Sequence, residues 1–231
     1  MTMIHRMRYP GGKGKCFQRL INLMPPHRVY IEPYLGGGAV LRHKRPAEIS
    51  IGLDLDPKVI KHWQHDLASP CTVLQADAVT YLSSYSYTGH ELVYADPPYL
   101  PSVRRREKVY RHDYTEEDHR KLLETIKRAG CMVMISGYPS ALYDDMLPGW
   151  HKVLFSAKTH TDVREECVWM NFDPPKRIHD GSHLGHTFRD RQTIKRRVSR
   201  MVDKFSLMDP IERDVLLGVL NGKYGALQEE I

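Results

Sequence analysis

Short runs of β-branched and aromatic residues alternate along most of the chain with segments of helical periodicity, and this alternation constrains the fold more than any other feature. Strands and helices that alternate in this way form parallel βαβ units, so the pattern argues against a β-sandwich or a helical bundle. The sequence therefore predicts an α/β protein. The predicted strands are Val29–Tyr34, Ile49–Asp54, Thr72–Asp77, Leu92–Asp96, Cys131–Gly137, Val153–Ala157 and Cys167–Phe172.

One helix has clear boundaries in the sequence. It is predicted from Thr115 to about Ala129, because Thr115 is a suitable N-cap, Asp118 occupies the capping-box position and Gly130 follows the last turn. Its apolar stripe consists of Leu122, Leu123 and Ile126.

The character of the chain changes after Phe172, where Asp173-Pro174-Pro175 breaks the last strand and a polar segment follows. We expect a main domain over residues 1–173, a linker over 174–187 and a basic helical extension over 188–231. His179, His183 and His186 are interpreted as linker histidines, since no Cys or carboxylate pattern completes a metal site. The helices are predicted to carry apolar faces made by Ile194, Val198, Met201, Val202 and Phe205 and, facing inward, by Ile211, Val215, Leu216 and Val219.

The composition is that of an ordinary globular protein: 231 residues, 41% hydrophobic and 27% charged. It excludes disordered, collagenous and low-complexity chains. No apolar run is long enough to span a bilayer and the N-terminus lacks a signal-peptide core, so we expect a soluble cytoplasmic protein without a membrane partner. The 4 cysteines lie far apart and are predicted to be buried free thiols.

Positive charge is concentrated in two places. The chain has 34 Lys and Arg against 28 Asp and Glu, a formal net charge of +6, which favours a polyanionic partner. A solvated helix face is the alternative for either cluster alone. The candidate residues for contacting nucleic acid are Arg104, Arg105, Arg106, Tyr110 and Arg111 in the first cluster and Arg196, Arg197 and Arg200 in the second.

Acidic residues end three successive predicted strands, at Asp54, Asp77 and Asp96. Because the carboxyl ends of parallel strands meet at one edge of a sheet, where ligands bind, these carboxylates should gather there. A glycine turn, Glu32 to Gly38, follows the first strand at the same edge and would let a ligand approach the backbone closely. Glycine chemistry alone is equally compatible with a tight turn that has no ligand.

The strongest chemical signal is Asp96-Pro97-Pro98-Tyr99. Two prolines stiffen the backbone between a carboxylate and an aromatic ring. The ring suits stacking on a planar base, while the carboxylate and a backbone carbonyl suit the two N–H bonds of an exocyclic amine such as that of adenine N6. A simple strand end is the alternative, as Asp173-Pro174-Pro175 illustrates, but the adjacent tyrosine and the strand-end position argue against it.

These motifs resemble, in their order, the Dam-like family of S-adenosylmethionine-dependent DNA adenine N6-methyltransferases with an Asp-Pro-Pro-Tyr motif, particularly its compact phage and mobile-element members. The resemblance covers roughly residues 6–172. It rests on Arg8-Tyr9-Pro10-Gly11-Gly12-Lys13, Glu32-Pro33-Tyr34-Leu35-Gly36-Gly37-Gly38-Ala39-Val40, Asp54-Leu55-Asp56-Pro57, Asp77, Asp96-Pro97-Pro98-Tyr99, Tyr114-Thr115-Glu116-Glu117-Asp118-His119 and Ser136-Gly137-Tyr138.

The resemblance implies a Rossmann-like class I methyltransferase sheet, mostly parallel with an antiparallel last strand, and a role for each motif. Tyr9 and Lys13 would contact the methionine end of the cofactor, and the turn containing Glu32, Pro33, Gly36 and Gly38 would cradle it. Asp54 would bind the ribose hydroxyls and Asp77 the adenine of the cofactor. Asp96, Pro97, Pro98 and Tyr99 would hold a flipped-out target adenine in double-stranded DNA, with Asp96 also close to the cofactor.

Several alternatives stay open. The intervals between the strand-end aspartates have no room for the long target-recognition insertion of larger family members, so we expect a short or relaxed recognition site. The same chemistry could act on RNA adenine or on cytosine N4, or the chain could bind nucleic acid without catalysis. The sequence does not decide between a monomer and a homodimer, and the family suggests that methylation marks DNA or shields it from restriction.

Overall fold

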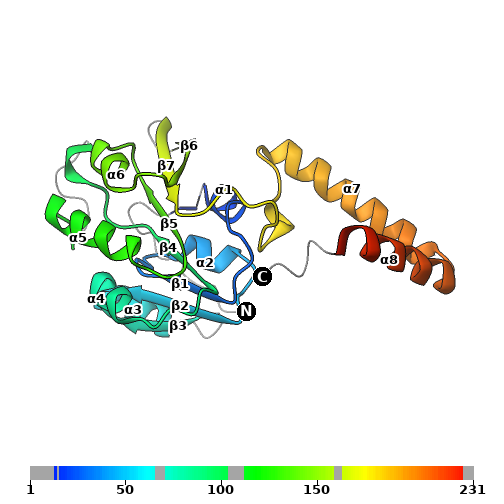
Figure 1. Cartoon of the computed structure of the whole chain (residues 1–231), viewed down its shortest axis with the longest axis horizontal. Helices are drawn as coiled ribbons and strands as arrows, with labels where there is room; N and C mark the ends of the chain where they lie inside the picture. The colour runs from blue at the N-terminus through cyan, green and yellow to red at the C-terminus, as the bar shows by residue number, and fades with distance from the viewer. Residues whose placement is uncertain (1–12, 15, 66–70, 104–111, 159–162, 226–231) are drawn as a thin grey trace. The chain divides into compact units, whose positions relative to one another are not determined.

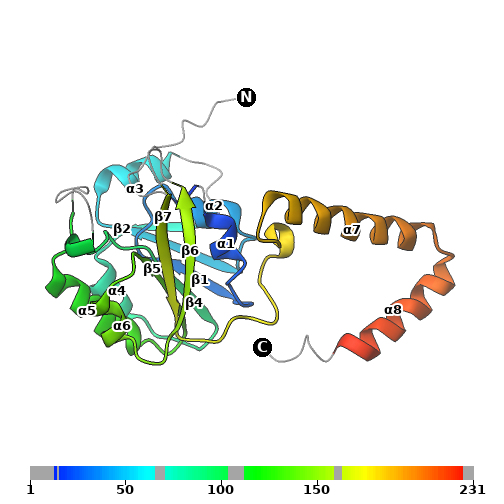
Figure 2. The ribbon, with the colours of Figure 1, turned by 90° about the horizontal axis from the view of Figure 1, so that it is seen from above.

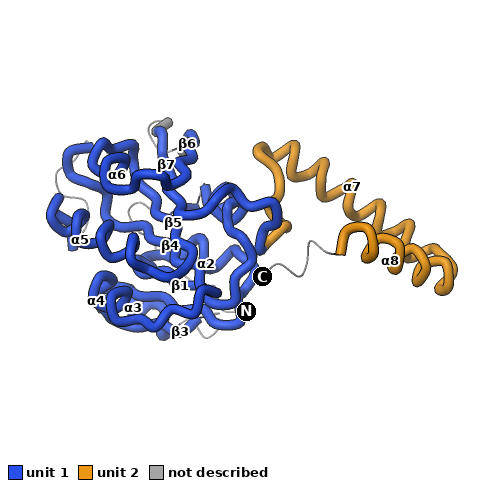
Figure 3. Tube along the Cα trace, in the orientation of Figure 1, with its two compact units in different colours: residues 1–179 blue, residues 180–231 orange. Residues whose placement is uncertain are grey.

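The computed structural model describes residues 13–14, 16–65, 71–103, 112–158 and 163–225. The chain forms two compact units, a sheet unit over residues 1–179 and a helical unit over residues 180–231 (Figure 3). The division between them falls inside the segment 174–187 that the sequence assigns to a linker.

In the described part of the sheet unit, seven strands form one sheet in the order β3-β2-β1-β4-β5-β7-β6 (Figure 1). The strands β1 to β5 run parallel, and β7 is antiparallel to both β5 and β6. This order, with its reversed β7, is that of class I methyltransferases, so the predicted fold is confirmed. The strands are β1 Val29–Glu32, β2 Ile49–Asp54, β3 Thr72–Gln75, β4 Glu91–Ala95, β5 Met132–Gly137, β6 His151–Lys158 and β7 Val163–Met170.

Helices cover both faces of this sheet (Figure 2). One core cluster joins the sheet to α1 Phe17–Ile21, α2 Ala39–His43 and α3 Pro57–Gln64. The other joins it to α4 Ala78–Ser84, α5 Glu116–Lys127 and α6 Ala141–Met146. Every residue of β4 is buried, with alternate side chains entering the two clusters. This central, doubly covered strand holds the Asp-Pro-Pro-Tyr motif at its carboxyl end.

The predicted start of α5 agrees with the structure, whereas the predicted start of the last strand does not. The capping box of α5 forms between Thr115 and Asp118, but the helix ends at Lys127, two residues before the predicted end. The last strand begins at Val163 rather than Cys167. The prediction began at Cys167 because the charged residues Arg164, Glu165 and Glu166 precede the apolar run in the sequence. The backbone of these residues nevertheless pairs with β6.

The helical unit contains a short 3₁₀ turn, Gly181–His183, and two longer helices, α7 Phe188–Leu207 and α8 Pro210–Tyr224. The predicted inward orientation of the α8 residues is wrong for this unit: Ile211 is 76% exposed, Val215 61% and Val219 60%. No residue of either helix is buried. Two amphipathic helices alone have too little surface to cover both apolar faces.

Two other sequence expectations need correction. His179 is not a linker histidine: it is buried, its backbone N–H donates to the Met24 carbonyl at 2.8 Å and its ring stacks on His27 at 3.9 Å between centroids. The four cysteines are thiols rather than disulfides, but only Cys16 and Cys167 are buried, because the other two precede the strands instead of lying within them. Within the described residues, no helix combines the length and apolarity needed to cross a membrane.

Candidate active site

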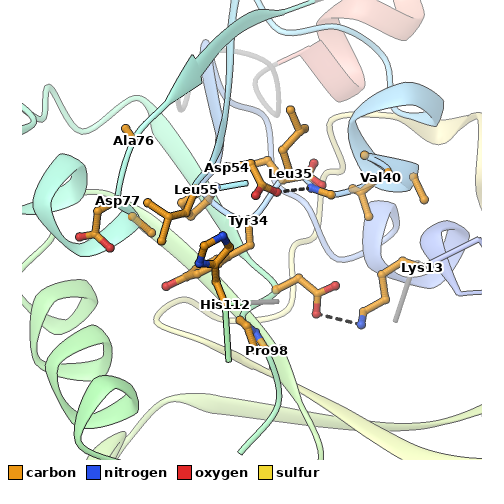
Figure 4. Close-up of a pocket in the computed structure, with 18 of the residues that line it drawn as sticks. Lys13, Tyr34, Leu35, Val40, Asp54, Leu55, Ala76, Asp77, Pro98 and His112 are labelled. Carbon is orange, nitrogen blue, oxygen red and sulfur yellow. Dashed lines mark hydrogen bonds and ion pairs between the residues drawn. The ribbon is translucent and has the colours of Figure 1, made fainter. Parts of the chain in front are cut away.

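A cleft of about 810 Å³, including its open mouth, lies at the carboxyl ends of β1 to β4 (Figure 4). The structure brings together here the residues that the sequence places at strand ends. They are Glu32, Asp54, Asp77 and Asp96, with Lys13, Pro98 and the turn from Pro33 to Val40 completing much of the wall.

The glycine turn after β1 is held from several sides. The Gly36 N–H donates to Asp54 Oδ2 at 2.8 Å, and the Trp63 indole N–H donates to the Gly36 carbonyl at 2.9 Å. Gly36 and Gly38 have φ values of 45° and 57°, which other residues rarely adopt. A Cβ on Gly38 would lie 2.2 Å from the Trp63 ring. Both the backbone conformation and this close approach therefore require glycine at position 38.

Asp54 and Asp77 each organise the backbone around the cleft. Asp54 accepts a second hydrogen bond, from the Asp56 N–H at 2.9 Å, so its carboxylate joins the turn after β1 to the start of α3. Burial raises the pKa of Asp54, while the two backbone N–H donors oppose that shift. Asp77 caps α4 by accepting from the backbone and hydroxyl of Thr80, both at 2.8 Å. Sequence reasoning missed both of these structural roles.

Asp96 is fixed through a single oxygen. Its Oδ1 receives the Lys13 ammonium at 2.8 Å and the Ser136 hydroxyl at 2.7 Å. Among the described residues, none donates a hydrogen bond to the other oxygen, Oδ2. The carboxylate also lines the cleft and is 18% exposed. Asp96 is therefore an oriented hydrogen-bond acceptor with one oxygen available to a ligand.

Lys13 is the buried counter-ion of this site. Burial alone would lower its pKa, but Asp96 and Glu166, at 2.8 and 3.6 Å, outweigh that effect and hold the pKa well above its ordinary value. Lys13 also donates to the Tyr99 hydroxyl, which in turn donates to Glu166 at 3.2 Å. One lysine thus links the beginning of the chain to β4 and β7.

The Tyr99 ring is enclosed in this structure. The side chain is 6% exposed, with the Lys13 ammonium 4.7 Å from the ring centroid and the Tyr138 ring edge-on at 4.5 Å. Pro97 is likewise buried, whereas Pro98 lines the cleft. A base can stack on Tyr99 only after the groups that cover the ring move apart.

Glu32 is the most deeply buried carboxyl group of the cleft, at 3% exposure. It accepts a hydrogen bond from the Tyr30 hydroxyl at 2.8 Å. Burial raises its pKa to about 8, with the negative charge of Asp96 adding to the shift and the Tyr30 bond opposing it. The raised pKa favours the protonated form of Glu32, which can donate as well as accept a hydrogen bond.

The other predicted residues fall into two groups. Tyr9, Arg104, Arg105, Arg106, Tyr110 and Arg111 lie outside the described residues. Arg196, Arg197 and Arg200 are exposed on α7 in the helical unit.

Some residues of the site were not assigned by sequence reasoning. Ser136 was noted only as part of a family motif, and Glu166 lies within a charged stretch without any motif. Tyr34 and Tyr114 meet through their hydroxyls at 2.9 Å on the cleft wall, beside His112. Tyr114, like Ser136, was noted only as part of a family motif, whereas Glu166 had no such signal.

Comparison with known proteins gives structural matches only. No family model matches the chain, and no curated protein matches its sequence. An rRNA methylase from Streptococcus thermophilus is 11% identical, with 71% of this chain and 97% of that chain covered and a TM-score of 0.46. The 23S rRNA methyltransferase ErmE is 12% identical, with 87% and 91% covered and a TM-score of 0.44. Magnesium protoporphyrin IX methyltransferase from Synechocystis PCC 6803, solved with bound S-adenosylmethionine, is 15% identical, with 67% and 74% covered and a TM-score of 0.44. The assignment of the fold therefore rests on the strand order itself.

Proposed function

We propose that this chain is an S-adenosylmethionine-dependent methyltransferase that modifies the N6 amine of adenine in DNA. The observation that carries the proposal is the orientation of Asp96. Its carboxylate is fixed through Oδ1 at the end of a central strand, which leaves Oδ2 available, and the Pro97 carbonyl comes next in the chain. Two adjacent acceptors match the two N–H bonds of an exocyclic amine.

The residues that line the cleft suit the proposed cofactor chemically. The glycine turn brings the backbone of Gly36, Gly37 and Gly38 to the wall of the cleft. Asp54 at the end of β2 offers acceptors for the ribose hydroxyls. Asp77 follows the next strand, where the adenine would bind, and Lys13 lies at the opposite end of the lining (Figure 4), which suits the methionine end. When bound, S-adenosylmethionine supplies an electrophilic sulfonium methyl group.

The residues around Asp96 would act by positioning and electrostatics. An aromatic amine is a poor nucleophile while its lone pair is delocalised into the ring. Acceptance of its N–H bonds by Asp96 and by the Pro97 carbonyl draws it toward tetrahedral geometry. Asp96 would also serve as a base for the proton that the amine must lose, and Lys13 and Ser136 hold its carboxylate in place. No covalent enzyme intermediate is needed.

The charge distribution favours a nucleic acid as the substrate, and the choice of DNA rests on the resemblance of the sequence motifs. The chain carries a formal net charge of +6, and three arginines lie exposed on α7. Adenine N6 is out of reach of an enzyme inside a duplex, so the base must be flipped out, at a cost of a few kcal/mol that phosphate contacts offset. Stacking of that base on Tyr99 accounts for an aromatic residue at the fourth position of the motif.

The proposal is tested by product analysis. Wild type, Asp96→Ala and Asp173→Ala are incubated with unmethylated DNA and S-adenosylmethionine, and the DNA is digested to nucleosides for mass spectrometry. Asp173 is a matched control because it opens the other Asp-Pro-Pro sequence and its side chain is 94% exposed. We expect N6-methyl-2′-deoxyadenosine from wild type and Asp173→Ala and at least about a 100-fold loss in Asp96→Ala.

Cofactor binding by calorimetry and circular dichroism accompany the assay, so that unfolding of Asp96→Ala is not mistaken for a catalytic defect. Methylation of cytosine N4 or of RNA alone would contradict the proposed substrate. Absence of any methylated product from DNA or RNA would contradict the proposed activity.

A further inference from the structure

Glu166 is a buried carboxylate beside the candidate active site, and the proposed reaction gives it no task. Its side chain is 9% exposed, and burial of a charge is unfavourable unless its partners compensate for the lost water. It lies on β7, whose pairing with β5 ends where Cys167 faces Gly137. Glu166 is therefore the first residue beyond the paired end of β5. Because β4 and β5 are parallel, this is the sheet edge at which Asp96 follows β4.

The charge of Lys13 does not by itself account for Glu166. Asp96 neutralises Lys13 at shorter range, with 2.8 Å between Nζ and Oδ1, whereas Glu166 Oε2 lies 3.6 Å from the same nitrogen. One ammonium group thus faces two carboxylates, and the second adds a desolvation cost that neutrality does not require. Glu166 Oε2 also accepts a hydrogen bond from the Tyr99 hydroxyl, at 3.2 Å.

The Tyr99 hydroxyl needs an acceptor inside the protein. The side chain is 6% exposed, and Lys13, which donates to the hydroxyl oxygen, has an ammonium group that cannot accept a hydrogen bond. The hydroxyl proton must therefore go to another group, because a buried donor without an acceptor is unfavourable. Glu166 supplies that acceptor. The Tyr99 ring is thus held at its hydroxyl end by two hydrogen bonds of opposite direction.

Lys13 joins the two parts of the motif that would handle the target base. Its ammonium group contacts both Asp96 Oδ1 and the Tyr99 hydroxyl, so one nitrogen fixes the amine acceptor and the stacking ring relative to each other. Glu166 contacts Lys13 and Tyr99, yet it does not line the cleft that suits the cofactor. We propose that Glu166 is a positioning residue of the target-base site, which orients the Tyr99 ring through its hydroxyl. The inference rests on the proposed function.

This role separates the effects on catalysis from those on cofactor binding. A base that stacks on Tyr99 presents its amine to Asp96 only while the ring keeps its orientation, and a small misplacement of reacting groups lowers the rate strongly. Loss of the Glu166 carboxylate should therefore reduce kcat and leave the affinity for S-adenosylmethionine unchanged. A residue that only supported the fold would affect both.

Methylation kinetics of the full chain on unmethylated DNA test the inference, with calorimetry of S-adenosylmethionine binding on the same preparations. Glu166→Met removes the charge and the acceptor, so kcat should fall at least about tenfold while the cofactor Kd changes less than about twofold. Glu166→Gln keeps an acceptor for the Tyr99 hydroxyl and should retain most of the wild-type kcat. Glu165→Met is the matched control and should keep the wild-type kcat, because Glu165 is the adjacent glutamate of β7 and is exposed.

Tyr99→Phe shows whether Glu166 acts through the hydroxyl. This variant keeps a ring for stacking and removes the donor, so it should show the same separation, with kcat at least about tenfold lower and cofactor affinity unchanged. In the Tyr99→Phe background, Glu166→Met should change kcat less than about twofold further. Losses that multiply would overturn the inference. If Glu166→Met does not fold, Tyr99→Phe provides the decisive comparison, since it removes the same hydrogen bond from the other side.

The outcomes distinguish this inference from the function on which it rests. Absence of a methylated product from wild type would overturn the proposed function and the inference with it. With an active wild type, equal kcat values for Glu166→Met and Glu165→Met would overturn the inference alone. So would a loss of cofactor affinity as large as the loss of kcat, or a Glu166→Gln variant as impaired as Glu166→Met.

Discussion

The buried lysine of the candidate site leads to a quantitative prediction. Lys13 is 5% exposed and lies 2.8 Å from Asp96 and 3.6 Å from Glu166. At an effective dielectric constant of about 20, these distances correspond to attractions of about 6 and about 5 kcal/mol, from which the cost of desolvating the three charges is subtracted. Lys13→Met removes the attraction and leaves two largely buried carboxylates close together. We expect the free energy of unfolding to fall by about 3–5 kcal/mol.

Urea denaturation at pH 7, followed by tryptophan fluorescence, is a suitable assay. All 3 tryptophans lie in the sheet unit, at positions 63, 150 and 169, so the signal reports on the unit that contains Lys13. Lys121→Met is the matched control, because Lys121 pairs with Glu117 at 3.8 Å on the surface and both side chains are more than half exposed. Its loss should not exceed about 0.5 kcal/mol.

The second carboxylate provides an internal check. In the Lys13→Met background, Glu166→Gln removes a charge that has lost its counter-ion, so it should cost less than in wild type, with a coupling of about 1–3 kcal/mol. If Lys13→Met loses no more stability than Lys121→Met, or if the two site substitutions are additive, Lys13 does not neutralise this cluster and the electrostatic reasoning is refuted.

Three other predictions concern the walls of the cleft. Burial raises the pKa of Glu32 from 4.5 to about 8 in the folded chain, so the stability that its proton provides is complete below pH 4.5 and is lost as the pH rises towards 8. Glu32→Gln should flatten that decline, which is at most about 1.4 kcal/mol per pH unit, in melting curves from pH 5 to 8. Gly38→Ala should cost about 2–4 kcal/mol in urea denaturation, because it combines a positive φ with a Cβ 2.2 Å from the Trp63 ring. Gly149→Ala, at a φ of 80° with open space around it, should cost only about 1–2 kcal/mol, and equal losses would rule out the contact. Asp54→Ala should weaken S-adenosylmethionine binding at least about tenfold by calorimetry, and unchanged affinity would show that Asp54 only supports the turn.

Parts of the fold and of the site could be predicted from residues that are close together in the sequence. The strand Ile49–Asp54 was predicted to the residue, because an alternating apolar run bounded by polar residues needs no information from elsewhere in the chain. The gathering of Asp54, Asp77 and Asp96 at one cleft follows from the parallel direction of their strands. The Thr115 cap is equally local, since both partners lie within one turn of helix.

Other features depend on the positions of residues that are distant in the chain. Glu166 reaches Lys13 only because β7 inserts between β5 and β6 in reverse, and no pattern around a single glutamate announces such a neighbour. His179 has a linker-like sequence, yet it is buried because its backbone and ring find partners at Met24 and His27.

The sequence by itself determined the α/β class, the main strands and the chemical character of the cleft, because periodicity, capping and strand direction act over a few residues. The tertiary structure decided which charges pair and which oxygen of Asp96 stays available. Pairing and burial depend on long-range register, in which a shift of one residue moves a side chain to the other face of the sheet.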